Sequence, residues 1–293
     1  MPLVTIGVPL FNEATYVEDA LASLLEQDYP NFEIVVVDNG STDRTEAICR
    51  DLADKDKRVQ YHRLPENLGA ASSSNRTIAL AAGTYFMRAS GHDRWSPNYV
   101  SSCVAAIALR PDAVIAFGST EWIDEANRPY PKETGWSDMR GMSAVERFFT
   151  QLWGNMHPIM GVARTDTIRR AMPFANMAAA DLALLLELSL MGEFVHAPAA
   201  TWYRRETRGP QSYRQRMRRY KSDDFGLIRS RLDALIPYAR LVTRIPRIIL
   251  RSRISMVEKA VLLGLLYPTM IGRYVGAIMR HAATYEREKA PSE

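Results

Sequence analysis

The sequence predicts an α/β fold in which a mostly parallel sheet is flanked by helices and followed by a C-terminal helical extension. Short apolar segments rich in β-branched residues alternate with longer amphipathic segments over residues 3–119, and this alternation is typical of repeated strand and helix units. From residue 211 onward the pattern is helical, first basic and then apolar. Units that repeat at this length favour parallel strands joined by right-handed crossovers.

Five strands are predicted, at residues 3–8, 32–37, 59–63, 85–89 and 113–119. Four helices connect or follow them: one capped by Asn12, one over residues 44–55, one after the turn at residues 67–69, and one starting at Pro97. The first of these helices has an apolar face at the helical spacing, made of Val17, Ala20, Leu21, Leu24 and Leu25. Two more helices are predicted at residues 144–153 and 181–191.

Residues 120–143 are predicted to form a long loop that contains Trp122, Tyr130 and Trp136. A loop of this length either shapes a binding site or covers an edge of the sheet.

The most informative segment is residues 32–43, where an apolar strand ends at Asp38 and a polar loop leads into a helix. Asp43 followed by Glu46 has the pattern of a capping box at the start of that helix. Ligands of open α/β sheets bind at the carboxyl ends of the strands. We therefore expect the Asp38 carboxylate to contact a ligand, the alternative being a residue that only caps a helix or a turn.

Composition allows a sizeable enzyme in a reducing compartment. With 293 residues and 47% hydrophobic content, the chain can bury a core as one large domain or as one domain with an appendage. Its two cysteines, Cys49 and Cys103, lack metal-ligand spacing, and the N-terminus lacks the pattern of a secretory signal. These features favour a cytoplasmic protein.

Positive charge is concentrated in residues 204–253, which contain 15 Arg and Lys against 4 Asp and Glu. Such a segment is attracted to nucleic acid or to anionic lipid, and the absence of a nucleic-acid-binding motif favours lipid. The apolar run at residues 260–272 is 13 residues long and contains Pro268, whereas a spanning helix needs about 20. It is expected to be broken at Pro268 and to form a packed helix pair or to lie in a membrane interface.

Polar residues follow two adjacent strands of the predicted sheet. Pro9, Phe11, Asn12 and Glu13 stand at the end of the first strand, Asp38 ends the second, and Asn67 and Gly69 belong to a third loop at the same edge. This arrangement suits a nucleoside, since a carboxylate can accept the N3–H of uracil while backbone groups meet its carbonyls.

Three motifs in this order resemble those of glycosyltransferase family 2. They are V-x-I-x-V-P-x-[YF]-N-E at residues 4–13, V-D-[DN]-G-S-x-D at residues 37–43 and N-x-G at residues 67–69. The resemblance covers residues 3–205 and is strongest before Trp95. It implies a GT-A, Rossmann-like fold and an inverting transferase with a nucleotide-diphospho-sugar donor. A dinucleotide-binding fold is disfavoured because no G-x-G-x-x-G follows the first strand.

The match departs from the family at the metal motif. Family members usually carry D-x-D after the fourth strand, and here Ser90 and His92 stand at these positions with Asp93 beside them. The resemblance implies that Ser90 contacts the donor and that His92 with Asp93 binds a divalent cation, Mn²⁺ or Mg²⁺, of which imidazole suits Mn²⁺ better. Otherwise Arg88 or Arg94 supplies positive charge to the diphosphate and His92 is an ordinary surface residue.

A second departure is Ser74, which stands where the family often has an arginine that reaches the diphosphate.

On the acceptor side, the resemblance makes Asp181 the catalytic general base. It opens a predicted helix, with Ala180 in place of the family's usual glutamate. The alternative for Asp181 is a first-turn acid stabilised by the helix dipole. His157, Arg164, Arg204 and Arg205 are weaker candidates.

The family's Q-x-x-R-W motif of processive members is absent, because residues 215–219 lack the tryptophan. We therefore predict a hexosyltransferase-like, non-processive enzyme in two parts, a GT-A domain at residues 1–209 and a basic and apolar helical tail at residues 210–293.

The expected partners are a nucleotide-sugar donor, UDP-sugar first, and a glycan or lipid-linked acceptor in cell-surface glycan or glycolipid synthesis. The tail is expected to bind an anionic membrane at the inner face of the cell membrane, or to form a homo-oligomer, and no nucleic acid is expected. The alternative is a non-catalytic nucleotide-sugar-binding or scaffold protein with a degenerate metal motif.

Overall fold

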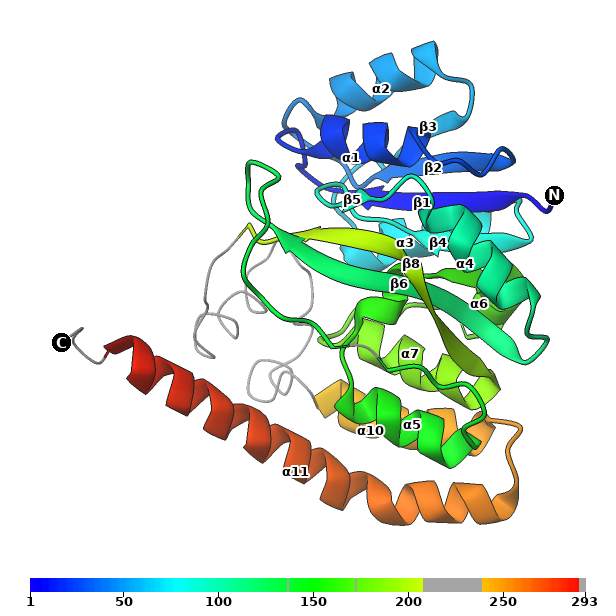
Figure 1. Cartoon of the computed structure of the whole chain (residues 1–293), viewed down its shortest axis with the longest axis vertical. Coiled ribbons are helices and arrows are strands. Elements are labelled where there is room, and N and C mark those ends of the chain that lie inside the picture. Colours follow the sequence, from blue (N-terminus) through cyan, green and yellow to red (C-terminus); the bar gives the residue numbers. More distant parts are fainter. Residues whose placement is uncertain (136, 172, 208–238, 290–293) are drawn as a thin grey trace.

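The computed structural model describes residues 1–135, 137–171, 173–207 and 239–289, and in this part of the chain a mixed sheet is flanked by helices (Figure 1). The strand order is β3-β2-β1-β4-β7-β6-β8-β5. The strands are β1 (Val4–Leu10), β2 (Phe32–Asp38), β3 (Val59–Arg63), β4 (Tyr85–Arg88), β5 (Arg94–Trp95), β6 (Ala113–Ile123), β7 (Val162–Arg164) and β8 (Glu193–Arg205). The α/β class with a mostly parallel sheet is confirmed.

The first four strands pair in parallel, as predicted. In β1 and β2 nearly every side chain is buried, because helices cover both faces of the sheet and only continuous apolar strands suit that position. Their register pairs Val4 with Phe32 and Leu10 with Asp38. The two carboxyl ends therefore lie side by side, which brings together the polar loops that follow them.

The other half of the sheet departs from simple repetition. Strand β7 inserts between β4 and β6 and is antiparallel to both, while β8 pairs with β6 in parallel and with β5 in antiparallel fashion. Strand β6 continues to Ile123, so the predicted loop at residue 120 begins too early. Strands β5 and β8 were not predicted. Pro198 and a register shift after Gly118 interrupt the alternation of apolar and polar residues in β6 and β8. The two strands are far apart in the sequence and pair through their backbones.

The helices form two layers, each with its own core. Those described are α1 (Val17–Leu25), α2 (Thr45–Lys55), α3 (Ala70–Leu80), α4 (Tyr99–Ala108), α5 (Ala144–Trp153), α6 (Thr165–Ala171), α7 (Ala180–Met191), α10 (Ala239–Arg251), α11 (Met256–Lys289) and the short 3₁₀ helix η1 (His157–Met160). Helices α1, α2 and α4 pack on one face of the sheet through residues such as Leu21 and Ile107. Helices α3, α6 and α7 cover the other through residues such as Ile78 and Leu185.

Two predicted helix starts and one predicted capping box are wrong. Helix α1 begins at Val17 rather than after Asn12, because Asn12 has a positive φ of 54° and belongs to a loop. Helix α2 begins at Thr45 without a side-chain cap, since Glu46 pairs with Arg63 instead of closing a capping box. Helix α4 begins at Tyr99, two residues after Pro97.

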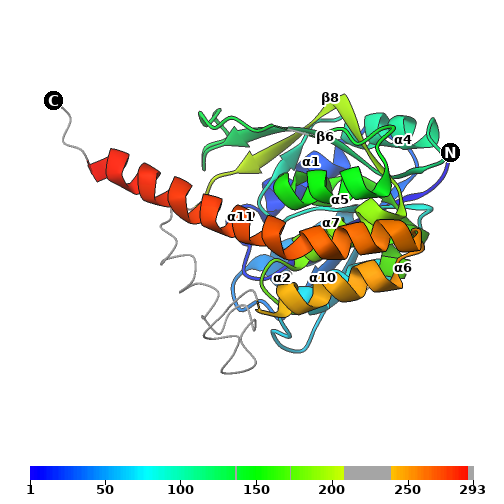
Figure 2. The same ribbon diagram turned by 90° about the horizontal axis from the view of Figure 1, so that it is seen from below.

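The C-terminal helices pack on the body of the protein. Helix α10 lies against α7, and α11 lies against α5 and α10 (Figure 2). Their shared core includes Phe148, Leu186, Ile245, Ile249 and Leu262. Fully burying one such side chain contributes about 1.5–3 kcal/mol, so these helices stabilise the body that they cover.

Helix α11 continues through Pro268, so the predicted break is wrong. Pro268 and Gly264, four residues earlier, are both exposed, and water can therefore bond the Gly264 carbonyl that loses its donor. No helix within the described ranges is both long and apolar enough to cross a bilayer. Three features of the sequence lie outside the described residues: Trp136, the domain boundary predicted at residue 209, and most of the basic segment at residues 204–253.

Candidate functional site

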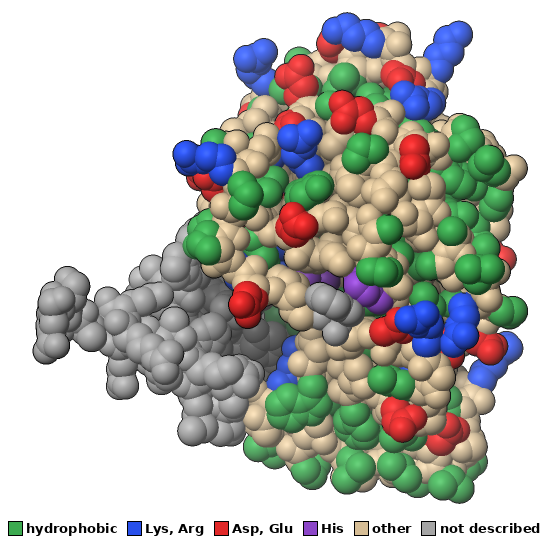
Figure 3. All heavy atoms as spheres, viewed as in Figure 1, with side chains coloured by type: hydrophobic (Ala, Val, Ile, Leu, Met, Phe, Trp, Pro, Cys, Tyr) green, Lys and Arg blue, Asp and Glu red, His purple; other side chains and the backbone are tan. Residues whose placement is uncertain are grey.

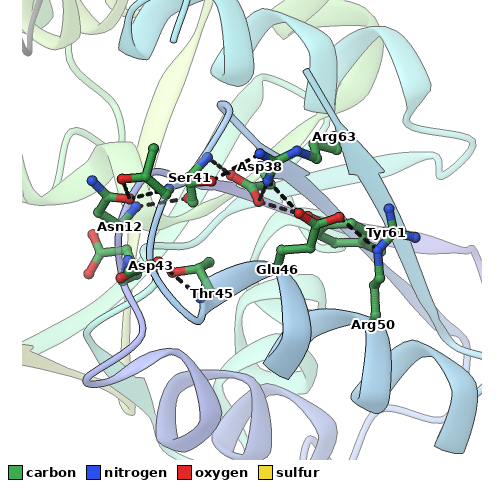
Figure 4. Close-up of polar contacts among 11 residues, drawn as sticks. Asn12, Asp38, Ser41, Asp43, Thr45, Glu46, Arg50, Tyr61 and Arg63 are labelled. Carbon is green, nitrogen blue, oxygen red and sulfur yellow. Dashed lines mark hydrogen bonds and ion pairs between the residues drawn. The ribbon is translucent and has the colours of Figure 1, made fainter. Parts of the chain in front are cut away.

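The loops that follow β1 and β2 are bound to each other by hydrogen bonds (Figure 4). The backbone N–H of Asn12 donates to Oγ of Ser41 at 2.9 Å, and the Oδ1 of Asn12 accepts from the N–H of Thr42 at 2.9 Å. The N–H of Glu13 donates to Oγ1 of Thr45 at 2.8 Å. The predicted residues Asn12 and Glu13 therefore form one polar surface with the loop after Asp38.

Asp38 is fully buried at the end of β2 and has three hydrogen-bond donors. Its Oδ1 accepts from the N–H of Ser41 at 2.8 Å, and its Oδ2 accepts from the Tyr61 hydroxyl at 2.7 Å and from Nη1 of Arg63 at 3.1 Å (Figure 4). Burial raises the pKa of Tyr61 well above its usual value, and the bond to Asp38 adds to this shift.

A carboxylate has about four acceptor positions, so the three donors of Asp38 leave one unused, and because the side chain is fully buried a neighbouring group would have to move for a ligand to reach it. Contact between Asp38 and a base stays a prediction.

The third predicted loop joins the same site through Asn39, which sequence reasoning missed. Nδ2 of Asn39 donates to Oδ1 of Asn67 at 2.7 Å, and its Oδ1 accepts from the N–H of Leu68 at 3.0 Å. Gly69 has a φ of 86° just before α3, and a Cβ there would lie 3.0 Å from Nδ2 of Asn176. The one sequence feature that could have indicated a role for Asn39 is its position directly after a buried strand. The structure thus brings Asp38, Asn67 and Gly69 to one edge of the sheet.

The loop after β4 is fixed from both sides. Asp93 is 2% exposed, and its two oxygens accept from the N–H of Arg205 and from the Ser90 hydroxyl. Nδ1 of His92 lies 2.9 Å from Oε1 of Glu13. The loop with the predicted donor and metal residues is therefore adjacent to the loop after β1.

The geometry does not fit a divalent cation held jointly by His92 and Asp93. Asp93 directs its carboxylate toward Ser90 and Arg205, whereas His92 faces Glu13. Over the described ranges, no three or more His, Cys, Asp or Glu side chains are grouped to hold a metal ion. A cation at this loop remains a prediction from sequence.

Asp181 lies beside the end of β4. Helix α7 starts after Ala179, whose φ of 59° is left-handed, and Asp181 occupies its first turn without capping it. Its Oδ1 is 3.5 Å from Nη1 of Arg88, and its side chain is 42% exposed. The Arg88 guanidinium lies 5.6 Å from the centre of the Phe174 ring. An exposed carboxylate at this position can reach a substrate hydroxyl.

The weaker candidates have structural partners. The Arg205 guanidinium is buried and bonded to Asp19 and to the carbonyl of His92. Nη1 of Arg204 lies 3.1 Å from Nε2 of His157. Burial, with the nearby charge of Arg204, lowers the pKa of His157 to about 3, so this imidazole is neutral at pH 7.

Two tryptophans stand beside His157. Its ring meets Trp202 edge-on at 5.3 Å, while Trp122 lies under the cations of Lys132 and Arg204 at 3.5 and 4.4 Å. Arg164 bonds the carbonyls of Ala113, Ile107 and Arg110 and so anchors β7.

Parallel strands with polar carboxyl ends, and a carboxylate at the start of a nearby helix, are the arrangement of an α/β protein with a ligand site at that edge of the sheet. The sequence model described as Glycosyl transferase family 2 matches residues 5–170. The chain therefore belongs to glycosyltransferase family 2.

Two relatives illustrate this kinship. An uncharacterized glycosyltransferase of Haemophilus influenzae is 29% identical over 188 residues, which are 64% of this chain and 72% of that protein. The putative teichuronic acid biosynthesis glycosyltransferase TuaG of Bacillus subtilis is 36% identical over 97 residues, 33% of this chain and 38% of that protein. The match thus spans most of the first relative and well under half of the second.

Two solved structures share the fold. TarS 1–349 of S. aureus in complex with UDP-GlcNAc has a TM-score of 0.66 at 18% identity, over 88% of this chain and 69% of that one. The mannosyltransferase PcManGT of Pyrobaculum calidifontis, in complex with GDP-Man and Mn²⁺, has a TM-score of 0.56 at 19% identity, over 97% and 86%. At these identities the likeness establishes the GT-A architecture alone.

Proposed function

We propose that this chain is an inverting, non-processive glycosyltransferase that moves a sugar from a nucleotide-diphosphate donor to a hydroxyl acceptor. One observation carries the proposal. The loops with Asn12, Asp38 and Asn67 meet at one edge of the sheet, and Asp181 opens α7 beside the end of the neighbouring strand β4. A donor bound along that edge would place its sugar near the carboxylate.

In this proposal Asp181 is the general base. The acceptor oxygen forms a bond to the anomeric carbon while the bond from that carbon to the diphosphate oxygen breaks. The electron pair leaves with the diphosphate, and the acceptor proton passes to Asp181. Its exposure of 42% supports this role, since a base must lie within hydrogen-bond reach of the hydroxyl.

UDP-sugar is the first choice of donor because the remaining acceptor position of Asp38 suits the N3–H of uracil. Thymine presents the same group, so a dTDP-sugar fits equally. The described structures of TarS and PcManGT contain UDP-GlcNAc and GDP-Man, respectively, which makes GDP the third nucleotide to test.

The acceptor is proposed to be a glycan or a lipid-linked glycan at the inner face of the cell membrane. The name of TuaG refers to teichuronic acid biosynthesis, which agrees with a role in cell-surface glycan synthesis. Helix α11 offers an attachment surface, since hydrophobic side chains gather along the lower edge of the molecule where it runs (Figure 3). The exposed ones include Met256, Val257, Val261, Leu265 and Ile271.

This apolar surface of α11 adjoins Arg251 and Arg253, which are also exposed. Exposed apolar residues beside basic ones are typical of helices that lie in an anionic membrane interface. We therefore assign anionic lipid as its partner and a cytoplasmic, peripheral location to the protein.

A thermal-shift screen of nucleotide-diphosphate sugars, with and without Mn²⁺, tests the donor. A ligand at 100 times its dissociation constant adds about 2.7 kcal/mol to the unfolding free energy. Stabilisation by a donor together with sugar transfer supports the proposal. Binding without turnover on any acceptor would favour a non-catalytic binding protein, the reading that the altered metal motif suggests.

A further inference from the structure

The end of β4 carries a guanidinium two residues before Ser90, the first altered position of the metal motif. We infer that Arg88 binds the donor diphosphate in place of a divalent cation, and that Asp181 holds this guanidinium until the donor arrives. The inference rests on the proposed function. It identifies the Arg88 guanidinium as the positive charge that neutralises the leaving diphosphate.

Arg88 has hydrogen-bond donors without acceptors. Its side chain is 20% exposed, and its ion pair with Asp181 is 3.5 Å long, which is at the limit of a hydrogen bond. Its Nε is buried without a partner. Buried polar atoms are normally bonded, so an unpartnered guanidinium nitrogen beside a proposed active site marks a position for an anion. The planar fork of arginine matches the oxygens of phosphate.

Other arginines near the strand ends are held more closely. Arg63 pairs with Glu46 at 2.8 Å, Arg205 with Asp19 at 2.9 Å and Arg94 with Asp19 at 3.4 Å. Of these four residues, Arg88 has the longest ion pair. It is also the one of the four with a buried side-chain nitrogen, Nε, that lacks a partner, so an anion at this position would satisfy a donor that the protein leaves unbonded.

The loop after β4 gives a reason for this substitution. Asp93 is engaged by Ser90 and Arg205, and His92 faces Glu13. Ser74, on α3, is uncharged and supplies no positive charge there. A leaving diphosphate develops negative charge as the sugar departs and needs a preorganised cation. Arg88 provides that charge from a rigid strand.

The pairing also links donor binding to the base. Without donor, Arg88 and Asp181 face each other. When the diphosphate engages Arg88, the Asp181 carboxylate loses that partner and becomes available to the acceptor hydroxyl. Diphosphate and carboxylate thus compete for one guanidinium.

The first test is calorimetric titration of the parent and its variants in the presence of EDTA. The ligand is UDP, GDP or dTDP, whichever binds the parent most tightly, and the matching nucleoside monophosphate is titrated for comparison. We expect Arg88→Met to weaken diphosphate binding about 10-fold or more, as loss of a charge-assisted bond does, and monophosphate binding less. Arg88→Lys should fall between. Arg110→Gln, at an arginine outside the proposed site that pairs with Glu193 at 3.2 Å, should stay within about 2-fold of the parent.

The second test separates binding from folding. Asp181→Asn removes the competitor, so the diphosphate should bind about 2–5-fold more tightly, and this gain should be absent in the double variant with Arg88→Met. A merely structural Arg88 would not produce that dependence, and thermal melts identify a variant that fails to fold.

Binding that requires Mn²⁺ in the parent and is unchanged in Arg88→Met and Arg88→Lys would overturn this inference while leaving the proposed function intact. Failure of all three diphosphates to bind the parent, with or without Mn²⁺, would overturn the proposed function and this inference with it.

Discussion

Tyr61 on β3 donates its hydroxyl to the buried carboxylate of Asp38 on β2, at 2.7 Å. The two residues face each other from adjacent strands, so a side chain from outside the recognised motifs fixes the orientation of the central acid. The pair is testable apart from any ligand.

Tyr61→Phe should lower the unfolding free energy by about 1.5–3 kcal/mol, because a hydrogen bond to a buried charged group is lost. Urea denaturation measures this change. Tyr29→Phe is the matched control, since Tyr29 donates to the neutral carbonyl of Pro2 at 2.6 Å, and it should cost about 0.5–1.5 kcal/mol. Equal losses in both variants would mean that Asp38 does not depend on Tyr61.

Asp181→Asn should reduce transfer by about 10²–10⁴-fold, because a general base typically contributes this much to the rate. Donor binding, measured by calorimetry, should remain within a few-fold of the parent. Glu187→Gln, on the same helix, is the control and should keep parental turnover. If Asp181→Asn retains more than half of that turnover, another group is the base.

Asp38→Ala should act in the opposite sense and weaken donor binding first. Its carboxylate is the proposed acceptor for the uracil N3–H, and Arg63 would also lose one of its two carboxylate partners. Thermal melts confirm that the variant is folded before UDP binding is measured by calorimetry. Unchanged affinity for UDP would place the base pocket elsewhere.

Stability should rise with pH between about 3 and 6.5 because of His157. Its pKa falls from 6.5 to about 3 on folding, so in that window the unfolded chain binds more protons than the native one. The contribution is complete above pH 6.5 and is lost as pH falls, at up to about 1.4 kcal/mol per pH unit. His157→Gln should reduce the rise of the unfolding free energy between pH 5 and 7, measured by urea denaturation at pH 5, 6 and 7, while His62 and His196, whose pKa values burial also lowers, keep their part of it. An unchanged rise would exclude the effect.

The α11 surface should bind vesicles of phosphatidylcholine and phosphatidylglycerol, and the binding should weaken as salt rises because salt screens the basic residues. Combined Val261→Asp, Leu265→Asp and Ile271→Asp substitutions should abolish flotation with the vesicles. Leu109→Asp, at another apolar residue that is 81% exposed, should not. A parent that does not float but sediments as a dimer would make this face an interface between copies.

The parallel half of the fold was predictable because its signals are local. Apolar strands such as Phe32–Asp38 end at polar turns, and the register of β1 with β2 then brings Asn12 and Asp38 together. Strand β8 was missed because Pro198 and the bulge by Gly118 break its alternation. The start of α1 was missed because Asn12 bonds Thr42 in the next loop, which no local rule predicts.

For the proposed site, the sequence predicted which residues lie at the strand ends and at the start of α7 better than it predicted what they contact. Asp38, Asn67 and Asp181 stand where motifs placed them, but their partners Tyr61, Asn39 and Arg88 come from other strands and loops. Side chains that pair across the sheet leave no periodic signal in the chain. The packing of α10 on α7 likewise depends on distant apolar residues.

Arg205 fixes the loop after β4 in place. Its guanidinium is bonded to the carbonyls of His92, Asp124 and Glu125 and to the side chains of Asp19 and Asn127. A loop tied to so many segments cannot swing as a lid does, so in the proposed donor site its shape would be set before a sugar binds. Redesign of the proposed donor site should therefore begin by exchanging side chains of this loop. Insertions into the loop would instead break the hydrogen bonds that Arg205 makes.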